Sequence, residues 1–200
     1  MVNNELALCI TGLRAEKLFG AGYTDKVYSS TVIKQLIAVM VRFLEKNSQI
    51  KKVYIGMSSG IDLLFGIAIH KYRERNPNRE IDLYCVIPGR NQDRFFTREE
   101  KAQYKFIIDK VATTVIRLSD EQINPKLFIE RNQYMVDNSD LTLAFWDFNK
   151  SRSGTYNTMC YSRKQKHPVY LFDAKDICKK GEWWFPPSKD SGIKINDVHK

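Results

Sequence analysis

The stretch that decides the fold spans residues 130–158, which begin with ERNQYM (130–135), continue with the apolar run LTLAFW (141–146) and reach SGT (153–155). This order predicts a helix, a buried strand, a glycine turn and a second helix. Such a turn leaves free backbone N–H groups at a helix N-terminus, where they attract anions. Arg131 precedes the strand and can donate a bidentate hydrogen bond to a phosphate. The segment therefore predicts a site for a phosphorylated small molecule.

The same alternation extends along the chain in both directions. Apolar runs predict strands at residues 6–10, 53–55, 81–87, 113–118, 141–146 and 169–172. Capping residues and helical spacing of apolar side chains predict helices at residues 29–46, 61–75, 97–111, 125–137 and 155–164. Strands that alternate with helices favour an α/β fold with a mostly parallel sheet and helices on both faces.

Composition fits one globular domain with an anionic partner. The chain has 200 residues, of which 43% are hydrophobic and 28% charged, and its net charge is +9. This charge favours nucleic acid or a phosphorylated metabolite, although the basic residues are scattered along presumed helix faces. We expect a single domain over residues 1–180. The aromatic extension over residues 181–200 should pack on this domain or on a neighbouring subunit, because it would otherwise expose a large apolar patch.

The cysteines and histidines do not predict a metal site. The four cysteines include no Cys-x-x-Cys pair, and Cys9 and Cys85 lie in apolar runs that indicate core thiols. His70 and His167 lack metal-ligand spacing, and no cofactor is expected. Free thiols indicate a reducing compartment. Because the sequence shows neither a secretory signal nor a membrane span, we expect a cytoplasmic protein without a membrane partner.

Polar or glycine-rich loops follow several of the predicted strands, where open α/β sheets bind ligands. These loops offer backbone donors, hydroxyl groups and arginines, which suit phosphate and ribose. They have neither the P-loop ending nor the spacing of a dinucleotide fingerprint. Their recurrence at successive strand ends is what indicates a ligand site.

Two charged residues each allow two interpretations. Arg131 lies on the apolar stripe of its helix, so its charge needs a partner. That partner is either a carboxylate, such as Asp137 or Asp140, or the phosphate of a ligand. Asp62 either accepts a hydrogen bond from a ribose hydroxyl or stabilises the N-terminus of its own helix.

The chain resembles the SLOG superfamily of Rossmann-like proteins, most closely its YpsA-like branch. The resemblance covers residues 8–171 and rests on TGLR (11–14), LFG (18–20), the GMSSGID loop (56–62), residues 87–92, residues 131–140, FWD (145–147) and SGT (153–155). It implies a Rossmann-like three-layer sandwich that binds nucleotides or their derivatives. With the loops, it gives these candidate ligand-binding residues: Thr11, Gly12, Arg14, Ser58, Ser59, Gly60, Asp62, Pro88, Gln92, Arg131, Asn132, Ser153, Gly154 and Thr155.

The superfamily includes enzymes, DNA-binding proteins and sensors. Its LOG-type phosphoribohydrolases release a base from a nucleoside monophosphate, and its other members include DNA-processing protein A and sensors of signalling nucleotides in antiphage systems. Members commonly form homo-oligomers, so the resemblance implies a homo-oligomer. The sensors among the members imply a role in antiphage defence or counter-defence.

One departure from the LOG enzymes bears on catalysis. Arg131 and the pair Gly154 and Thr155 match the LOG pattern, but the position of its catalytic glutamate is Thr158, which cannot act as a carboxylate. The resemblance therefore favours a sensor or sequestering protein that binds an ADP-ribose-like or cyclic signalling nucleotide. A nucleotide N-glycosidase is the alternative, with its carboxylate from Asp62, Glu130 or Asp147. The third interpretation is a nucleic-acid-binding protein, although no concentrated basic and aromatic patch supports it.

Overall fold

A single parallel sheet organises the chain. The computed structural model describes residues 5–147 and 153–174, so part of the last turn and the predicted extension over residues 181–200 lie outside the described residues. The six strands follow the order β4-β3-β2-β1-β5-β6, and every neighbouring pair is parallel. They are β1 (Leu6–Gly12), β2 (Ile50–Ile55), β3 (Asp82–Ile87), β4 (Thr114–Arg117), β5 (Leu141–Trp146) and β6 (Val169–Asp173). This confirms the predicted strands.

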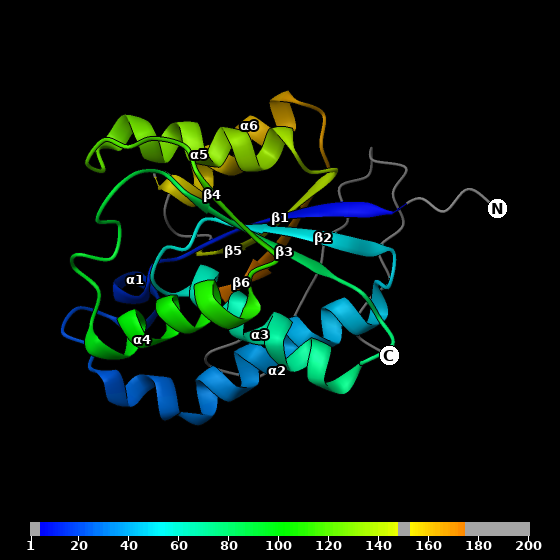
Figure 1. The fold of residues 1–200 in the computed structure, drawn as a ribbon, viewed down its shortest axis with the longest axis horizontal. Helices are drawn as coiled ribbons and strands as arrows, with labels where there is room; N and C mark the ends of the chain where they lie inside the picture. The colour runs from blue at the N-terminus through cyan, green and yellow to red at the C-terminus, as the bar shows by residue number, and fades with distance from the viewer. Residues whose placement is uncertain (1–4, 148–152, 175–200) are drawn as a thin grey trace.

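Helices cover both faces of the sheet. Figure 1 shows α5 and α6 over one face and α2, α3 and α4 over the other. The helices are α1 (Ala15–Phe19), η1 (Asp25–Ser29), α2 (Thr31–Lys46), α3 (Ile61–Arg75), α4 (Arg98–Phe106), η2 (Ile107–Val111), α5 (Pro125–Asp137) and α6 (Gly154–Lys164). The predicted Rossmann-like α/β sandwich is therefore confirmed. Across residues 5–147 and 153–174, no helix has the length and apolar character needed to cross a membrane.

The helix boundaries follow from local sequence signals. Thr97 caps α4, and Glu100 completes a capping box, while Pro125 occupies the first turn of α5. The prediction differs from the structure in two places. The helix expected at residues 97–111 changes to a π-helical turn at Ile107, and two short helices between β1 and α2 were not predicted. With five residues each, α1 and η1 are too short to give a periodic signal.

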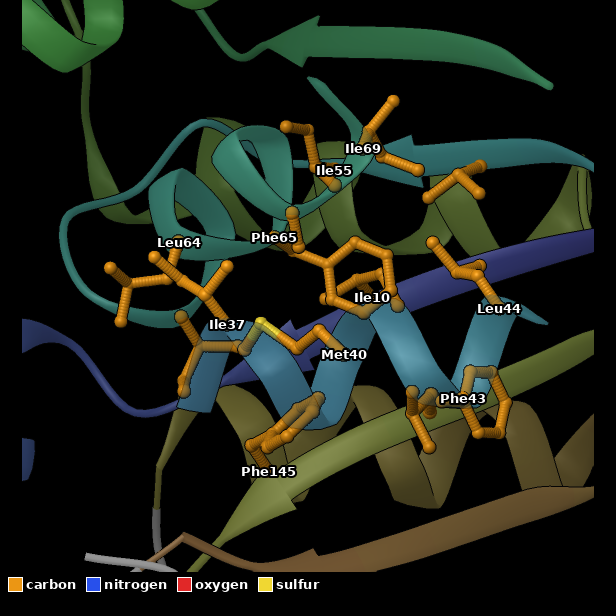
Figure 2. Close-up of a cluster of buried hydrophobic side chains, with 14 of the residues drawn as sticks. Ile10, Ile37, Met40, Phe43, Leu44, Ile55, Leu64, Phe65, Ile69 and Phe145 are labelled. Carbon is orange, nitrogen blue, oxygen red and sulfur yellow. The ribbon is translucent and has the colours of Figure 1, made fainter. Parts of the chain in front are cut away.

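The main core lies between the sheet and the layer of α2 and α3. Figure 2 shows Met40 of α2 and Phe65 of α3 beside Ile10 of β1, and all three side chains are fully buried. Phe145 of β5 stacks on Phe172 of β6 with ring centroids 4.7 Å apart. Cutting any of these large side chains to alanine would remove buried contacts and leave a cavity, at a cost of about 2–5 kcal/mol. This core fixes the strands whose ends form the site.

The two cysteines that lie in apolar runs are core thiols, as predicted. Cys9 and Cys85 are fully buried. Burial raises the pKa of both thiols to about 12, because the charged thiolate loses its hydration. Both groups therefore stay protonated at neutral pH.

The strand order creates a crevice at the carboxyl edge of the sheet. From β1 the chain moves outward through β2, β3 and β4, and it then returns by α5 to place β5 on the other side of β1. Loops diverge at such a reversal, so open α/β sheets bind ligands there.

Candidate functional site

A cleft of about 1240 Å³ opens at this carboxyl edge. Arg14 follows β1, Ser58 and Ser59 follow β2, and Gln92 follows β3, so three successive strand ends contribute to the lining. Residues of α5 and α6 form much of the remaining wall. The predicted meeting of the loops at one edge therefore produces a single cavity.

The predicted site residues divide into two groups. The residues that line the cleft are Arg14, Ser58, Ser59, Gln92, Asn132 and Gly154. The residues that do not line it are Thr11, Gly12, Gly60, Asp62, Pro88, Arg131, Ser153 and Thr155. Several residues of the second group instead hold in place the loops that carry the lining residues.

Two glycines bring the loops after β1 and β2 into contact. Gly60 has φ +83°, and a Cβ there would lie 2.5 Å from the carbonyl oxygen of Leu13. A Cβ at Gly12 would lie 2.5 Å from the side chain of Ile61. With both side chains absent, the backbone N–H of Ile61 donates to Leu13 O at 3.2 Å. Gly12 and Gly60 therefore position the loops and do not themselves line the cavity.

The N-terminus of α6 is also satisfied within the protein. The hydroxyl of Ser153 accepts a hydrogen bond from the backbone N–H of Tyr156 at 3.1 Å, which makes Ser153 the N-cap. Thr155 is buried, whereas a Cβ at Gly154 would have no atom within 4 Å. Of these three predicted residues, Gly154 is the one on the cleft surface.

Arg131 lies beneath the cleft. Only 5% of its surface is exposed. Its Nη1 donates to the carbonyl oxygen of Gly56, and its Nη2 donates to the Ser58 hydroxyl at 3.3 Å. Nη1 also lies 3.8 Å from Asp62 Oδ2. In this structure Arg131 therefore braces the β2–α3 loop from below.

The carboxylates first considered as partners of Arg131 are the wrong ones. Asp137 accepts a hydrogen bond from the Tyr161 hydroxyl at 3.0 Å, and Asp140 accepts one from the backbone N–H of Ala7 at 2.7 Å. Asp137 lies six positions further along the same helix, a rise of about 9 Å. The actual partner, Asp62, comes from another helix that tertiary packing brings near.

Arg131 and Asp62 form a buried ion pair. Asp62 Oδ2 also accepts a hydrogen bond from the Ser58 N–H at 3.1 Å. Burial raises the pKa of Asp62, and Arg131 opposes that shift. Burial likewise lowers the pKa of Arg131, and Asp62 opposes it. Each charge therefore offsets part of the desolvation cost of the other.

Gly56 is required where the brace meets the loop. A Cβ at this position would overlap Arg131 Nη1, so only glycine leaves room for the guanidinium. Gln92 Nε2 donates to the same Gly56 carbonyl at 2.8 Å. Its other amide atom, Oε1, is buried and has no hydrogen-bond partner among residues 5–147 and 153–174. The inner wall of the cleft therefore carries an unpaired acceptor.

Positive charge gathers around the ring of Phe128. Arg14 is exposed and lies over this ring, with its Cζ 5.1 Å from the centroid, while Arg131 Cζ lies at 5.7 Å. Arg14 also lowers the pKa of Arg131 by charge repulsion, after the larger effect of burial. Two guanidinium groups thus lie close to one buried carboxylate, that of Asp62. This arrangement favours an anion at Arg14.

Sequence reasoning missed the aromatic residues that line the cleft. Phe128 precedes Arg131 by three positions on α5, so helical spacing gave a usable signal. Tyr23 and Phe95 lie in loops, where no periodicity predicts direction. Phe95 is 82% exposed, and Arg94 Cζ lies 4.4 Å from its ring centroid. The cleft therefore holds a second pair of arginine and aromatic side chains.

The three carboxylates considered for catalysis lie outside the cleft lining. These residues are Asp62, Glu130 and Asp147. Glu130 Oε1 lies 3.4 Å from Lys126 Nζ on the surface of α5, and Asp147 is buried. Thr158 does line the cleft, and its hydroxyl donates to the carbonyl oxygen of Gly154 at 2.9 Å.

Two other carboxylates, Glu16 and Glu100, line the cleft. Glu100 is 1% exposed. It accepts hydrogen bonds from the Tyr23 hydroxyl at 2.8 Å, the Tyr28 hydroxyl at 2.7 Å and the backbone N–H of Thr97 at 2.9 Å. Through these hydrogen bonds, Glu100 of α4 connects its own helix to Tyr23 and Tyr28, which precede α2 in the chain.

Two proteins of Bacillus subtilis are similar to this chain in sequence. The SPbeta prophage-derived protein YoqJ of Bacillus subtilis is 25% identical over 158 residues, which cover 70% of this chain and 89% of YoqJ. The UPF0398 protein YpsA of the same organism is 22% identical over 175 residues, which cover 85% of this chain and 93% of YpsA.

Solved structures of DNA processing protein A share the fold. The Streptococcus pneumoniae protein superposes with a TM-score of 0.55 at 16% identity, over 88% of this chain and 55% of that protein. The Helicobacter pylori protein gives 0.52 at 17% identity, over 84% and 66% respectively. Residues 8–177 match the family described as the YspA SLOG family, and the chain belongs to this family.

Proposed function

We propose that the cleft binds a nucleotide-derived small molecule, ADP-ribose-like or a cyclic signalling nucleotide, and that the protein acts as a sensor or sequestering protein. The observation that carries the proposal is the charge around Phe128. Arg14 lies over this ring on the cleft surface, Arg131 lies near it below, and Asp62 is the buried carboxylate beside them. A phosphate at Arg14 would form charge-assisted hydrogen bonds.

The rest of the lining suits the other parts of a nucleotide. Ser58 and Ser59 offer hydroxyls in the same cleft as Arg14, and Asn132 offers an amide. Gln92 Oε1, which has no partner among the described residues, can accept a hydrogen bond from a hydroxyl or an amine once side chains adjust to the ligand. Membership of the SLOG family supports nucleotide-related binding. The Helicobacter pylori relative of this fold binds single-stranded DNA, which is chemically related.

Binding without cleavage is the form of the proposal that the lining favours. Hydrolysis of an N-glycosidic bond would need a carboxylate at the reacting centre. Thr158 stands where the resembling enzymes carry glutamate, and its hydroxyl is engaged with Gly154. Glu100 lines the cleft but already accepts three hydrogen bonds. Glu16, the other carboxylate of the lining, is exposed and would have to serve the reaction, so the lining supports ligand retention better than ligand cleavage.

Calorimetric titration of the purified protein with ADP-ribose and cyclic AMP tests the proposal. We expect at least one of these probes to bind, and Arg14→Ala to weaken its binding about tenfold or more, because a hydrogen bond to a charged group contributes about 1.5–3 kcal/mol. Arg79→Ala is the matched control. Arg79 is exposed and donates to the Glu45 carbonyl at 3.0 Å, outside the cleft lining.

Two results would replace the proposal with another function. Release of free base or ribose phosphate from the probes would identify an N-glycosidase. Binding to single-stranded DNA that falls steeply with salt, without binding of either probe, would identify a nucleic-acid-binding protein. We also propose that the protein works as a homo-oligomer, and sedimentation velocity would reveal a monomer if this is wrong.

A further inference from the structure

We propose that the ligand carries two bases and that the second base stacks on Phe95 at the mouth of the cleft. This inference rests on the proposed function and narrows its ligand to a small dinucleotide. Its basis is a second pair of arginine and aromatic side chains, Arg94 and Phe95, on the same cavity that Arg14 and Phe128 line.

The size of the cleft indicates a ligand larger than one nucleotide. Its volume is about 1240 Å³, whereas pockets for drug-sized ligands occupy about 300–1,000 Å³. A mononucleotide held at Arg14 would leave much of this space to water. A second nucleoside unit would fill it and reach the mouth.

The environment of Phe95 is unusual for a phenylalanine. Phe96, the next residue, packs against the main core and meets the ring of Tyr104 edge-on at 5.8 Å. Phe95 instead remains 82% exposed. Arg94 lies over its ring at 4.4 Å, and the high exposure of the side chain leaves ring surface open. A base stacked there would bury apolar area that now faces water.

The charges of the lining favour a short ligand over a long strand. Arg14, Arg94 and Lys164 offer three positive groups for phosphates that join two nucleosides. Glu16 and Glu100 line the same cavity, and carboxylates there disfavour the continuous phosphate backbone of a polynucleotide. The lining therefore fits two bases joined through one or two phosphates.

Titration calorimetry of the full chain with AMP, cyclic di-AMP and single-stranded dA10 tests this inference. We expect cyclic di-AMP to bind the natural protein at least tenfold tighter than AMP. Phe95→Ala should weaken cyclic di-AMP binding roughly 5- to 150-fold, the range found when one stacking aromatic residue is removed, and should leave AMP binding within about twofold. Val115→Ala is the matched control, because Val115 is an exposed apolar residue of β4 that lies outside the cleft lining.

The contrary outcomes separate the two proposals. If AMP binds but cyclic di-AMP shows no preference, or if Phe95→Ala affects both ligands equally, the second base is refuted and the proposed function stands. If dA10 binds tightest and its binding falls steeply with salt, the ligand is a strand and the small-dinucleotide inference fails. If neither AMP nor cyclic di-AMP nor the probes ADP-ribose and cyclic AMP bind, both proposals fail.

Discussion

Replacing Arg131 with methionine tests whether this residue braces the loop or binds the ligand. Arg131 holds the β2–α3 loop through Gly56 O and the Ser58 hydroxyl, and it lies 3.8 Å from Asp62. Arg131→Met keeps an unbranched chain as far as the position of Nε but removes the guanidinium and with it all three interactions. The carboxylate of Asp62 then stays buried without its cation.

The expected loss of stability is large for a single substitution. Removing one member of a buried ion pair costs about 3–5 kcal/mol, because the remaining charge lacks compensation. For a chain of this size each kcal/mol lowers Tm by about 2–4 °C, so Tm should fall by about 6–20 °C. Adding Asp62→Asn should restore part of this loss, since it removes the stranded charge and the two sites are coupled by about 0.5–3 kcal/mol.

Urea unfolding followed by far-ultraviolet circular dichroism, without ligand at pH 7, measures these free energies. Lys126→Met is the matched control on the same helix, because Lys126 is 83% exposed and forms a surface pair with Glu130 at 3.4 Å. It should cost less than about 1 kcal/mol. A cost below 1 kcal/mol for Arg131→Met would refute the bracing role and favour a role for Arg131 in ligand binding.

Four further substitutions test other parts of the structure. Tyr28→Phe should cost about 1.5–3 kcal/mol in urea unfolding, because it removes a 2.7 Å hydrogen bond to the buried carboxylate of Glu100. An unchanged midpoint would contradict this. Gly60→Ala should cost about 2 kcal/mol or more, because the φ of Gly60 is +83° and a Cβ there would meet backbone atoms at 2.5–2.8 Å. Gly154→Ala is the control and should be near neutral, because a Cβ at Gly154 would have no atom within 4 Å. Burial raises the pKa of Cys9 from 9.0 to about 12, so the unfolded chain loses this proton first and stability falls as pH rises from 9 toward 12. Relative to Cys9→Ala, the natural protein should lose about 1.4 kcal/mol for each pH unit in that window, and parallel stability curves for the two proteins would refute the shift.

The fold could be predicted because its signals are local. Each strand carries a short apolar run, and caps such as the Thr97–Glu100 box and Pro125 mark helix starts. Five-residue α1 had no such signal. The π-helical turn at Ile107 also escaped prediction. Ile107 packs on Gly66, where a Cβ would lie 2.7 Å from its Cδ1, and this contact between two helices is invisible in one segment of sequence.

The candidate site could be predicted in outline but not residue by residue. Recurrent polar loops after β1, β2 and β3 correctly indicated the edge at which the cleft lies. The role of each arginine depends on distant partners. Arg131 points under the loop because Gly56 leaves room and Asp62 supplies a charge. Arg14 reaches the cleft because Phe128 supports it. Sequence spacing alone cannot tell an arginine that braces a loop from one that faces the cleft.

The buried pair and the ligand site are linked through charge. The guanidinium groups of Arg14 and Arg131 both contact the ring of Phe128, and their mutual repulsion opposes the charged state of Arg131. A ligand anion at Arg14 would reduce this repulsion, so binding should also stabilise the brace beneath it. The negative charge of Asp62 therefore has two opposing effects. Its charge keeps Arg131 in place, but it also weakens the positive potential that Arg14 presents to a phosphate.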